Sequence, residues 1–335
     1  MKLRYYIFLR ILMVIPTVII LLTTVFFLMH IIPGDPVTIM FGDEMPNEFL
    51  DEIRHRLGLD RPMYIQYIDY MSRFFRGDLG ISYRFKIPVT YKVRDVFPTT
   101  IELTIGGILL AILIGIPLGL LASLKKGGII DHIIRLASLY LYSNPNFWLA
   151  LLFQLYFGVM LRMLPISGRS PYIGYLPRVT GIMIVDSLLA LDFRAFRETI
   201  RYMILPWLTV GITRVPYLSR ISRAAMLNEL GEDYIITARA KGLKKSIIIY
   251  KHALRNAILP IITSIGGSFA FLLGGTVIVE KIFSLPGMGS LLMEGLTGRD
   301  FNMIQGVVGI YAIIVIVVNT LVDVLYAVAD PRVKF

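Results

Sequence analysis

Apolar stretches long enough to cross a lipid bilayer recur along the whole 335-residue chain, and they restrict its fold more than any other feature. About 20 helical residues span the roughly 30 Å hydrocarbon core, and the first stretch, residues 11–32, has that length. A backbone in lipid must satisfy its own hydrogen bonds, so each stretch is expected to be a helix. The later stretches are residues 101–124, 133–160, 202–225, 259–283 and 304–329. The sequence therefore predicts an all-α polytopic membrane protein with six transmembrane helices.

The charges divide the connecting segments into two kinds. Residues 213–256 contain nine Lys or Arg and three acidic residues, whereas residues 33–100 contain nine and ten. Because cytoplasmic loops carry the excess of Lys and Arg, residues 33–100 are predicted to be an extracytoplasmic region and both termini to lie inside. The net charge of +11 is assigned to this topology and not to nucleic-acid binding. We divide the chain into residues 1–32, the N-terminal tail and first helix, then 33–100, then a five-helix core of residues 101–335.

A secretory signal peptide is the alternative interpretation of residues 11–32. The apolar part of a signal peptide is shorter, and a small-residue cleavage site follows it. Here the sequence HIIPGDP follows instead. We therefore expect a retained helix.

Residue types that catalysis or metal binding requires are scarce. The chain has no cysteine and four histidines, no two of which have a ligand-like spacing, so a zinc or haem centre is not expected. No Ser/His/Asp, H-E-x-x-H or paired-carboxylate arrangement stands out, and the sequence contains no G-x-x-x-x-G-K-[ST] phosphate loop. We predict no catalytic residues, no metal site and no cofactor bound by this chain. If it moves a solute uphill, another chain or an ion gradient must supply the energy.

A polar, basic segment from Glu229 to Pro260 interrupts the apolar stretches. Acidic residues at its start favour a helix N-terminus, and Gly242 suits a bend because glycine tolerates φ > 0. The segment is predicted to form two short helices at the membrane surface. The apolar face of the second helix is expected to carry Ile247, Tyr250, Leu254 and Ile258, a spacing near 3.6 residues. Such an exposed pair of helices suits docking into a partner's groove, and binding to anionic headgroups is the alternative.

Within this segment, TARAKGL followed by HALRNAILP resembles the cytoplasmic coupling loop of ABC-importer permeases of the dipeptide/oligopeptide/nickel family. Ile236 replaces the glutamate of the general importer motif, and the interval from Gly242 to Pro260 is longer than usual. Both departures are habitual in the peptide branch. IPGDP, GDLGISY, LPISGR, E-x-x-F-x-x-P-G-x-G and the ending D-x-x-Y-x-x-x-x-P-R also resemble the family. The resemblance therefore covers nearly the whole chain and is greatest to the dipeptide permeases, of the B-subunit type.

This resemblance implies a type I ABC importer permease fold in the cytoplasmic (inner) membrane of a prokaryote. It further implies a heterodimer with a homologous second permease subunit, two cytoplasmic ABC ATPase subunits that bind ATP and Mg, and an extracytoplasmic substrate-binding protein. The implied substrates are di- and oligopeptides. The alternatives are nickel chelates or oligosaccharides for the same kind of importer, and a gradient-driven transporter without an ATPase.

Residues 229–258 are implied to be the coupling loop, with its ATPase contacts at the bend. The residues concerned are Thr237, Ala238, Arg239, Ala240, Lys241, Gly242 and Leu243.

Two groups of polar residues are predicted to line a translocation path. Ser143 and Asn144 precede Pro145, which breaks the hydrogen-bond ladder of its helix and leaves carbonyls that need polar partners. Asn319 and Asp323 lie one turn apart on an apolar helix and should point into a bundle. The alternatives are a purely structural kink and interhelical hydrogen bonding.

Three further features have two interpretations each. Arg214 lies inside the fourth stretch, where a charge marks a functional or paired site, but we favour snorkelling to the inner interface. Glu280, Pro286 and Gly287 of the outer motif are predicted to form an outer gate or interface, and a solvated carboxylate is the alternative. Aromatic residues of the extracytoplasmic region are expected to pack a small helix onto the membrane face, with contact to a binding protein as the alternative. These aromatic residues are Tyr64, Tyr67, Tyr70, Phe74 and Phe75.

Overall fold

The computed structural model describes residues 3–31, 36–41 and 45–329. These residues form helices joined by loops, the longest of which is residues 161–182, and an isolated bridge between Ile81 and Pro88 is their one β-type pairing. Most of the IPGDP motif and the terminal DPR lie outside the described residues. The α-helices are α1 (Leu3–Ile31), α2 (Pro36–Phe41), α3 (Asn47–Leu57), α4 (Met63–Phe75), α5 (Val89–Leu124), α6 (Ile129–Ser143), α7 (Asn146–Phe153), α8 (Met183–Leu189), α9 (Phe193–Ile212), α10 (Val215–Leu230), α11 (Asp233–Ala240), α12 (Leu254–Gly275), α13 (Val277–Ile282), α14 (Met288–Thr297) and α15 (Phe301–Ala329), and two π-helical segments are η1 (Gln154–Met160) and η2 (Ile247–Ala253).

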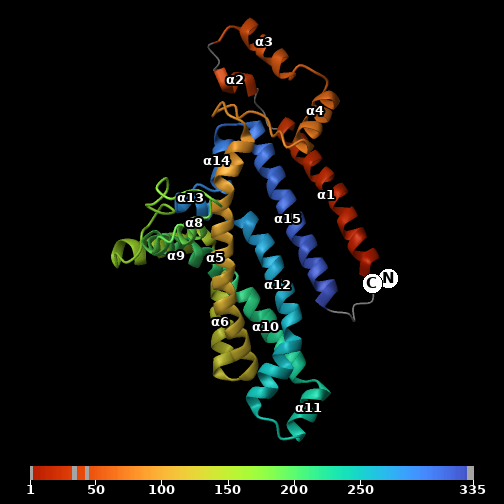
Figure 1. Ribbon diagram of the computed structural model, residues 1–335, viewed down its shortest axis with the longest axis vertical. Coiled ribbons are helices and arrows are strands. Elements are labelled where there is room, and N and C mark those ends of the chain that lie inside the picture. Colours follow the sequence, from red (N-terminus) through yellow and green to blue (C-terminus); the bar gives the residue numbers. More distant parts are fainter. Residues whose placement is uncertain (1–2, 32–35, 42–44, 330–335) are drawn as a thin grey trace.

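The molecule is elongated, with different structures at its two ends (Figure 1). Helices α2, α3 and α4 lie at one end, and α11 lies at the other. Helices α5, α12 and α15 run between these ends, and α1 packs antiparallel to α15. The first end carries the region predicted to lie outside, and the second carries the predicted coupling loop. They are called the outer end and the inner end after that prediction.

Among the described residues, four helices are long and apolar enough to cross a membrane, at Phe8–Ile31, Val89–Leu124, Ile247–Gly275 and Phe301–Val324. They match four of the six predicted stretches.

The other two stretches are each divided between two helices, as Pro145 predicts for the first of them. Residues 133–160 are divided between α6 and α7–η1, because Pro145 favours an extended conformation at the residue before it. Asn144 is indeed extended, with φ −93° and ψ 133°. Residues 202–225 are divided between α9 and α10 at Arg214, two residues before Pro216.

Three clusters of buried apolar side chains follow one another along the long axis. The outer cluster joins α1, α4, α5, α14 and α15, and includes Leu22, Phe74 and Met303. The middle cluster joins α5, α9, α10 and α12, with Phe283 at its edge. The inner cluster joins α10, α11, η2 and α12, and Ile235 is fully buried in it.

Glycines on α5 allow the closest helix packing in the middle cluster. A Cβ on Gly119 would lie 2.4 Å from the carbonyl oxygen of Ser219 on α10, and one on Gly107 would lie 2.8 Å from Val210 on α9. Small residues at these contacts let the helix backbones approach closely. The second apolar stretch is therefore closely packed against α9 and α10.

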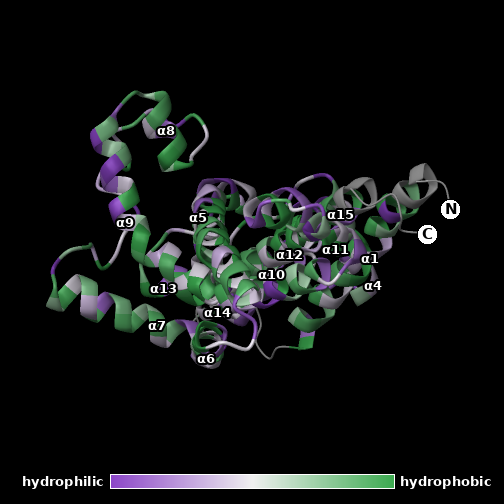
Figure 2. Cartoon of the chain, turned by 90° about the horizontal axis from the view of Figure 1, so that it is seen from below, coloured by the Kyte–Doolittle hydropathy of each residue, from purple (hydrophilic) through white to green (hydrophobic). Residues whose placement is uncertain are grey.

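Helices α7, α8 and α9 extend to one side of this body (Figure 2). The Gln154 side chain ties η1 back to the body, because it donates to the carbonyl oxygens of Ile166, at 2.6 Å, and Ile282, at 3.2 Å. Many apolar side chains on this extension are exposed, among them Leu151, Leu155 and Met160. The extension therefore presents an apolar surface to lipid or to another chain.

Candidate functional site

The predicted coupling residues form an exposed turn at the inner end of the molecule. Helix α11 ends at Ala240, and Gly242 follows with φ +74°, in the left-handed region. The turn is closed by hydrogen bonds from the Gly242 amide to the Arg239 carbonyl, at 2.9 Å, and from the Leu243 amide to the Ala238 carbonyl, at 3.3 Å. No atom lies within 4 Å of the position that a Cβ on Gly242 would take. The predicted bend is confirmed, and it faces open space.

Six of the seven predicted coupling residues are exposed, and one is not. Ala238 is 6% exposed and packs with Ile235 in the inner cluster. The Ala238 methyl group is therefore covered by its own chain. The exposed residues are Thr237, Arg239, Ala240, Lys241, Gly242 and Leu243.

The second short helix of the predicted pair does not exist as a separate element. Segment η2 continues directly into α12, giving one helical run from Ile247 to Gly275. Its buried face also differs from the predicted one, since Ile249, Ala253, Ala257 and Ile261 are buried, four residues apart. The predicted Ile247 and Tyr250 are exposed. The packing of α11 against η2 selects this face.

Tyr234 links α10, α11 and α12 at the same end. Its hydroxyl donates to the Glu229 carboxylate and accepts from the Asn256 amide, at 3.0 Å. Burial, together with the Glu229 hydrogen bond, raises the pKa of Tyr234 to about 12, so the hydroxyl keeps its proton near neutral pH. The sequence pattern carried no signal for this contact.

An ion pair fastens the inner ends of α5, α6 and α10 together. The Asp131 carboxylate accepts two hydrogen bonds from the Arg223 guanidinium, at 2.8 and 2.7 Å, and one from the Gly127 amide, at 3.0 Å. The hydrogen bonds from Arg223 hold the pKa of Asp131 well below its usual range. Sequence reasoning missed this pair because its partners lie in different stretches.

The Glu280 carboxylate of the outer motif is fully buried, so the solvated alternative is wrong. It accepts hydrogen bonds from the Thr100 hydroxyl at 2.8 Å, the Thr276 hydroxyl at 3.0 Å and the Ser290 amide at 3.0 Å. A Cβ on Gly287 would lie 2.3 Å from this carboxyl group, so only glycine leaves room for it. The motif therefore fastens α13 and α14 to α5.

The remaining predicted gate residue is placed differently. Pro286 is exposed beside the buried Gly287. It lies in the turn between α13 and α14, before the start of α14 at Met288.

The predicted path residues are not brought together. Ser143 and Asn144 hydrogen-bond to backbone carbonyls one turn earlier, Leu139 at 2.9 Å and Tyr140 at 2.5 Å. Their helix α6 packs on α5 and α10, whereas α15, which carries the other pair, packs on α1, α5, α12 and α14.

The two predicted path residues of α15, Asn319 and Asp323, lie in different surroundings. Asp323 points into the bundle as expected, because its carboxylate lies 2.8 Å from the Arg10 guanidinium of α1. Asn319 is exposed. The Arg10–Asp323 pair ties together the inner halves of α1 and α15.

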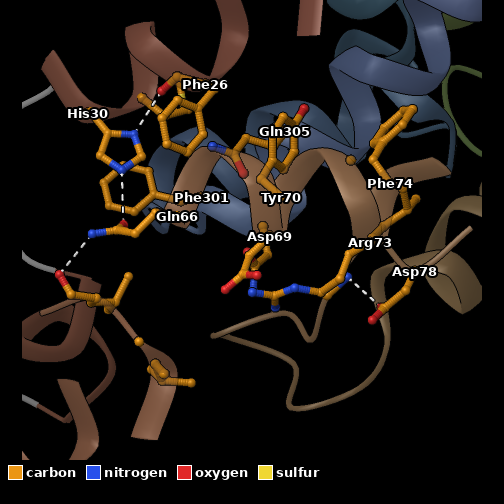
Figure 3. A pocket seen from close by; sticks show the side chains of 18 of the residues that line it. Phe26, His30, Gln66, Asp69, Tyr70, Arg73, Phe74, Asp78, Phe301 and Gln305 are labelled. Atoms are coloured by element: carbon orange, nitrogen blue, oxygen red, sulfur yellow. Dashed lines mark hydrogen bonds between the residues drawn. The ribbon is translucent and has the colours of Figure 1, made fainter. Parts of the chain in front are cut away.

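A cavity of about 330 Å³ lies at the outer end, between α1, α4 and α15 (Figure 3). Its lining combines the aromatic rings of Phe26, Tyr70 and Phe301 with polar side chains such as His30 and Gln66. Its walls join the extracytoplasmic region to the first and last membrane helices.

The predicted packing of the α4 aromatic residues is confirmed for part of the set. Tyr67 and Tyr70 contact Phe26 of α1, with ring centroids 5.4 and 5.7 Å away. Tyr64 and Phe75 are exposed and remain free for other contacts.

A metal site finds no support in the part of the chain that the structure describes, where no group of three His, Asp or Glu side chains is arranged to hold an ion. Its long apolar helices instead place the protein in a class, the multi-pass membrane proteins.

Comparison with known proteins identifies the family within this class. Residues 3–104 match the N-terminal part of the binding-protein-dependent transport system membrane components, and residues 115–335 match the family described as binding-protein-dependent transport system inner membrane component. The chain belongs to this family and is a multi-pass protein of the inner membrane.

Curated relatives match over nearly their whole length. The dipeptide transport system permease protein DppB of Haemophilus influenzae is 43% identical over 98% of this chain and 99% of its own. The Escherichia coli K12 protein of the same name is 40% identical over 96% of both chains. The di/tripeptide transport system permease protein DppB of Pseudomonas aeruginosa is 39% identical over 92% of both.

The fold is shared with a chain of the MetNI methionine ABC transporter in an inward-facing conformation. The TM-score is 0.53, with 17% identity, over 71% of this chain and 95% of that chain. The predicted ABC importer permease fold is therefore confirmed.

Proposed function

We propose that this chain is the permease subunit of an ATP-driven importer that moves dipeptides and other short peptides across the inner membrane. Relatives named for dipeptide transport, matched over more than nine-tenths of the chain, support the substrate class. Nickel chelates and oligosaccharides are the substrates that an uptake assay must exclude.

We also propose that the chain crosses the membrane six times. The third is formed by α6 with α7 and η1, and the fourth by α9 with α10, each bent at its interruption. Both termini then lie inside, and residues 33–100 lie outside. The placement of α2–α4 and α11 at opposite ends supports this topology (Figure 1).

A homologous second permease would complete the translocation path. Two cytoplasmic ATPases would bind the exposed turn after α11, and an external binding protein would deliver the peptide. ATP and Mg would bind to the ATPases, and this chain would bind no cofactor. The observation that carries the proposal is the exposed Gly242 turn, which lies beside the helical run from Ile247 to Gly275.

Coupling follows from the connection between this turn and the membrane helices. Ile235 and Ala238 bury α11 against η2, and Tyr234 hydrogen-bonds to both neighbouring helices. A displacement of α11 by the closing ATPases would therefore move α10 and α12 as packed bodies.

Affinity purification of the tagged chain from its native membrane in mild detergent tests the proposal. Mass spectrometry should find a second permease and ATPases, and the complex should hydrolyse ATP. Gly242→Asp should weaken ATPase association about tenfold, equivalent to about 1.4 kcal/mol. Its uptake of a labelled dipeptide should fall in parallel.

Gly174→Asp is the matched control. Gly174 also has positive φ, +89°, and no atom lies within 4 Å of its Cβ position. The Gly174→Asp variant should still bind the ATPases and should take up the labelled dipeptide as the wild type does. Recovery of the chain without any ATPase, with uptake that follows an ion gradient, would contradict the proposal.

A further inference from the structure

Arg214 lies deep in the bundle, where the structure contradicts snorkelling to the inner interface. It immediately precedes α10 and lies eleven residues before the inner end of the predicted stretch 202–225. At 1.5 Å per residue this is about 16 Å, close to half of the hydrocarbon thickness. The Arg214 guanidinium instead lies over the Phe271 ring of α12, 3.3 Å from its centroid.

Arg214 has no acidic partner among the residues that the structure describes, and its Nε is buried without a hydrogen bond. Three other arginines of the bundle and its edges form carboxylate pairs instead. These pairs are Arg10–Asp323, Arg169–Glu102 and Arg223–Asp131. Since an unpaired charge at membrane depth is costly, Arg214 is expected to receive an anion.

The surface beside Arg214 leaves room for a ligand. Phe271 is 60% exposed, and Gly267 and Gly274 lie one turn to either side of it on α12. No atom lies within 4 Å of the Cβ positions of these two glycines. Tyr142, also exposed, stands just before the predicted path residues Ser143 and Asn144. Arg214 thus borders an open face between α6, α10 and α12.

We propose that Arg214 binds the C-terminal carboxylate of a peptide as it passes along this face. The inference rests on the proposed function. A guanidinium binds a carboxylate through two parallel hydrogen bonds, and stacking on Phe271 holds its plane in place. Every peptide has this carboxylate whatever its side chains, and the two glycines leave those side chains unobstructed. The site therefore recognises peptides without selecting their sequence.

Uptake by the complete transporter in proteoliposomes tests this inference. The probes are L-alanyl-L-alanine and its C-terminal amide, each at a concentration that saturates the binding protein, whose occupancy is measured separately. The wild type should take up the acid about tenfold faster than the amide. Arg214→Gln should slow uptake of the acid about tenfold and bring the acid-to-amide ratio close to one. Arg214→Lys, which keeps the charge but not the paired geometry, should give an intermediate ratio, and it serves as the readout if Arg214→Gln fails to accumulate.

Two controls separate this role from a structural one. Co-purification of the partner subunits and ATPase activity stimulated by the binding protein should be unchanged in both Arg214 variants. Arg220→Gln removes an exposed arginine from another face of α10, six residues further along, and should leave the ratio at the wild-type value.

The outcomes that overturn the inference are distinct. Equal slowing of acid and amide in Arg214→Gln would make Arg214 a structural residue. Loss of the second permease from the purified complex, with the wild-type ratio kept, would assign its anion to a carboxylate of that subunit. A wild-type transporter that assembles but moves neither probe would overturn the proposed function itself, and this inference with it.

Discussion

Single residues in this chain make contacts that their positions in the sequence do not predict. Glu280 is such a residue, because its place at a helix end near the outer side suggested solvation. The structure buries it and directs three donors at its two oxygens. The glycines that follow in the motif are explained by the same contact, since Gly287 has no room for a side chain.

Glu280→Ala should therefore destabilise the outer half of the protein. It leaves the Thr100 and Thr276 hydroxyls and the Ser290 amide without their acceptor, at about 1–3 kcal/mol for each buried group left unpaired. Differential scanning fluorimetry in detergent should show a clear fall in Tm. Glu280→Gln keeps one acceptor oxygen, so its Tm should fall less. Glu294→Ala, on α14 and without a side-chain contact in the described structure, is the control. A Tm equal to that of the wild type in Glu280→Ala would refute the structural role.

Asp131 offers a prediction with a defined pH dependence. The pKa of this carboxyl is lowered in the folded state, chiefly by Arg223, from a reference value of 3.8. Its contribution to stability is therefore complete above that value and is lost as pH falls through the lower folded pKa. The free energy of unfolding of the wild type should exceed that of Asp131→Asn at about pH 7, and this difference should shrink as the pH falls to about 3. Arg223→Gln should behave like Asp131→Asn, since either change breaks the same pair. A stability difference that is constant over this pH range would contradict a stabilising Asp131–Arg223 ion pair.

At the scale of helices, packing decides which predictions hold. Ala238 and Ala240 look equivalent in sequence, as two small residues beside the bend, but the first is buried against η2 and the second is exposed. Ala238→Leu should overpack this contact and cost about 1–3 kcal/mol of stability. Ala240→Leu should leave the Tm unchanged and reduce ATPase co-purification instead. Thermal unfolding and co-purification measured on both variants separate the two roles, and equal Tm values would show that α11 does not pack as described.

The sequence predicted four of the long apolar helices and the bend at Gly242. It could do so because the length and apolarity of a stretch, and the tolerance of glycine for positive φ, are local properties. The interruption at Pro145 was also predictable, because proline breaks the helix ladder locally. The sequence did not show that residues 133–160 and 202–225 would each form two separate helices. It also chose the wrong face of η2, since the π-helical turn and the contact with α11 shift the buried positions. The Asp131–Arg223 and Glu102–Arg169 pairs could not be predicted, because partners separated by many residues leave no spacing pattern.

At the scale of the whole molecule, the stacked clusters connect the two functional ends through shared helices. Helix α5 contributes to both the outer and middle clusters, and α12 to the middle and inner ones. The outer motif around Glu280 and the inner turn at Gly242 are therefore joined by helices that pack on each other throughout. We expect a change at either end to be transmitted by movement of these packed helices.

The opposite placement of these ends also predicts their accessibility across the membrane. The chain contains no cysteine, so a single introduced cysteine reports one position without background labelling. Gly77, near the outer end, and Gly242, at the inner end, both have positive φ and no atom within 4 Å of their Cβ positions, so each should accept the small side chain at modest cost. In sealed right-side-out vesicles, a membrane-impermeant maleimide should label Gly77→Cys at once and Gly242→Cys only after the vesicles are opened. Inverted vesicles should reverse the result, which controls for intrinsic reactivity. Labelling of both positions from the same side would contradict a topology in which α2–α4 and α11 lie on opposite faces of the membrane, and with it the docking of ATPases at the Gly242 turn.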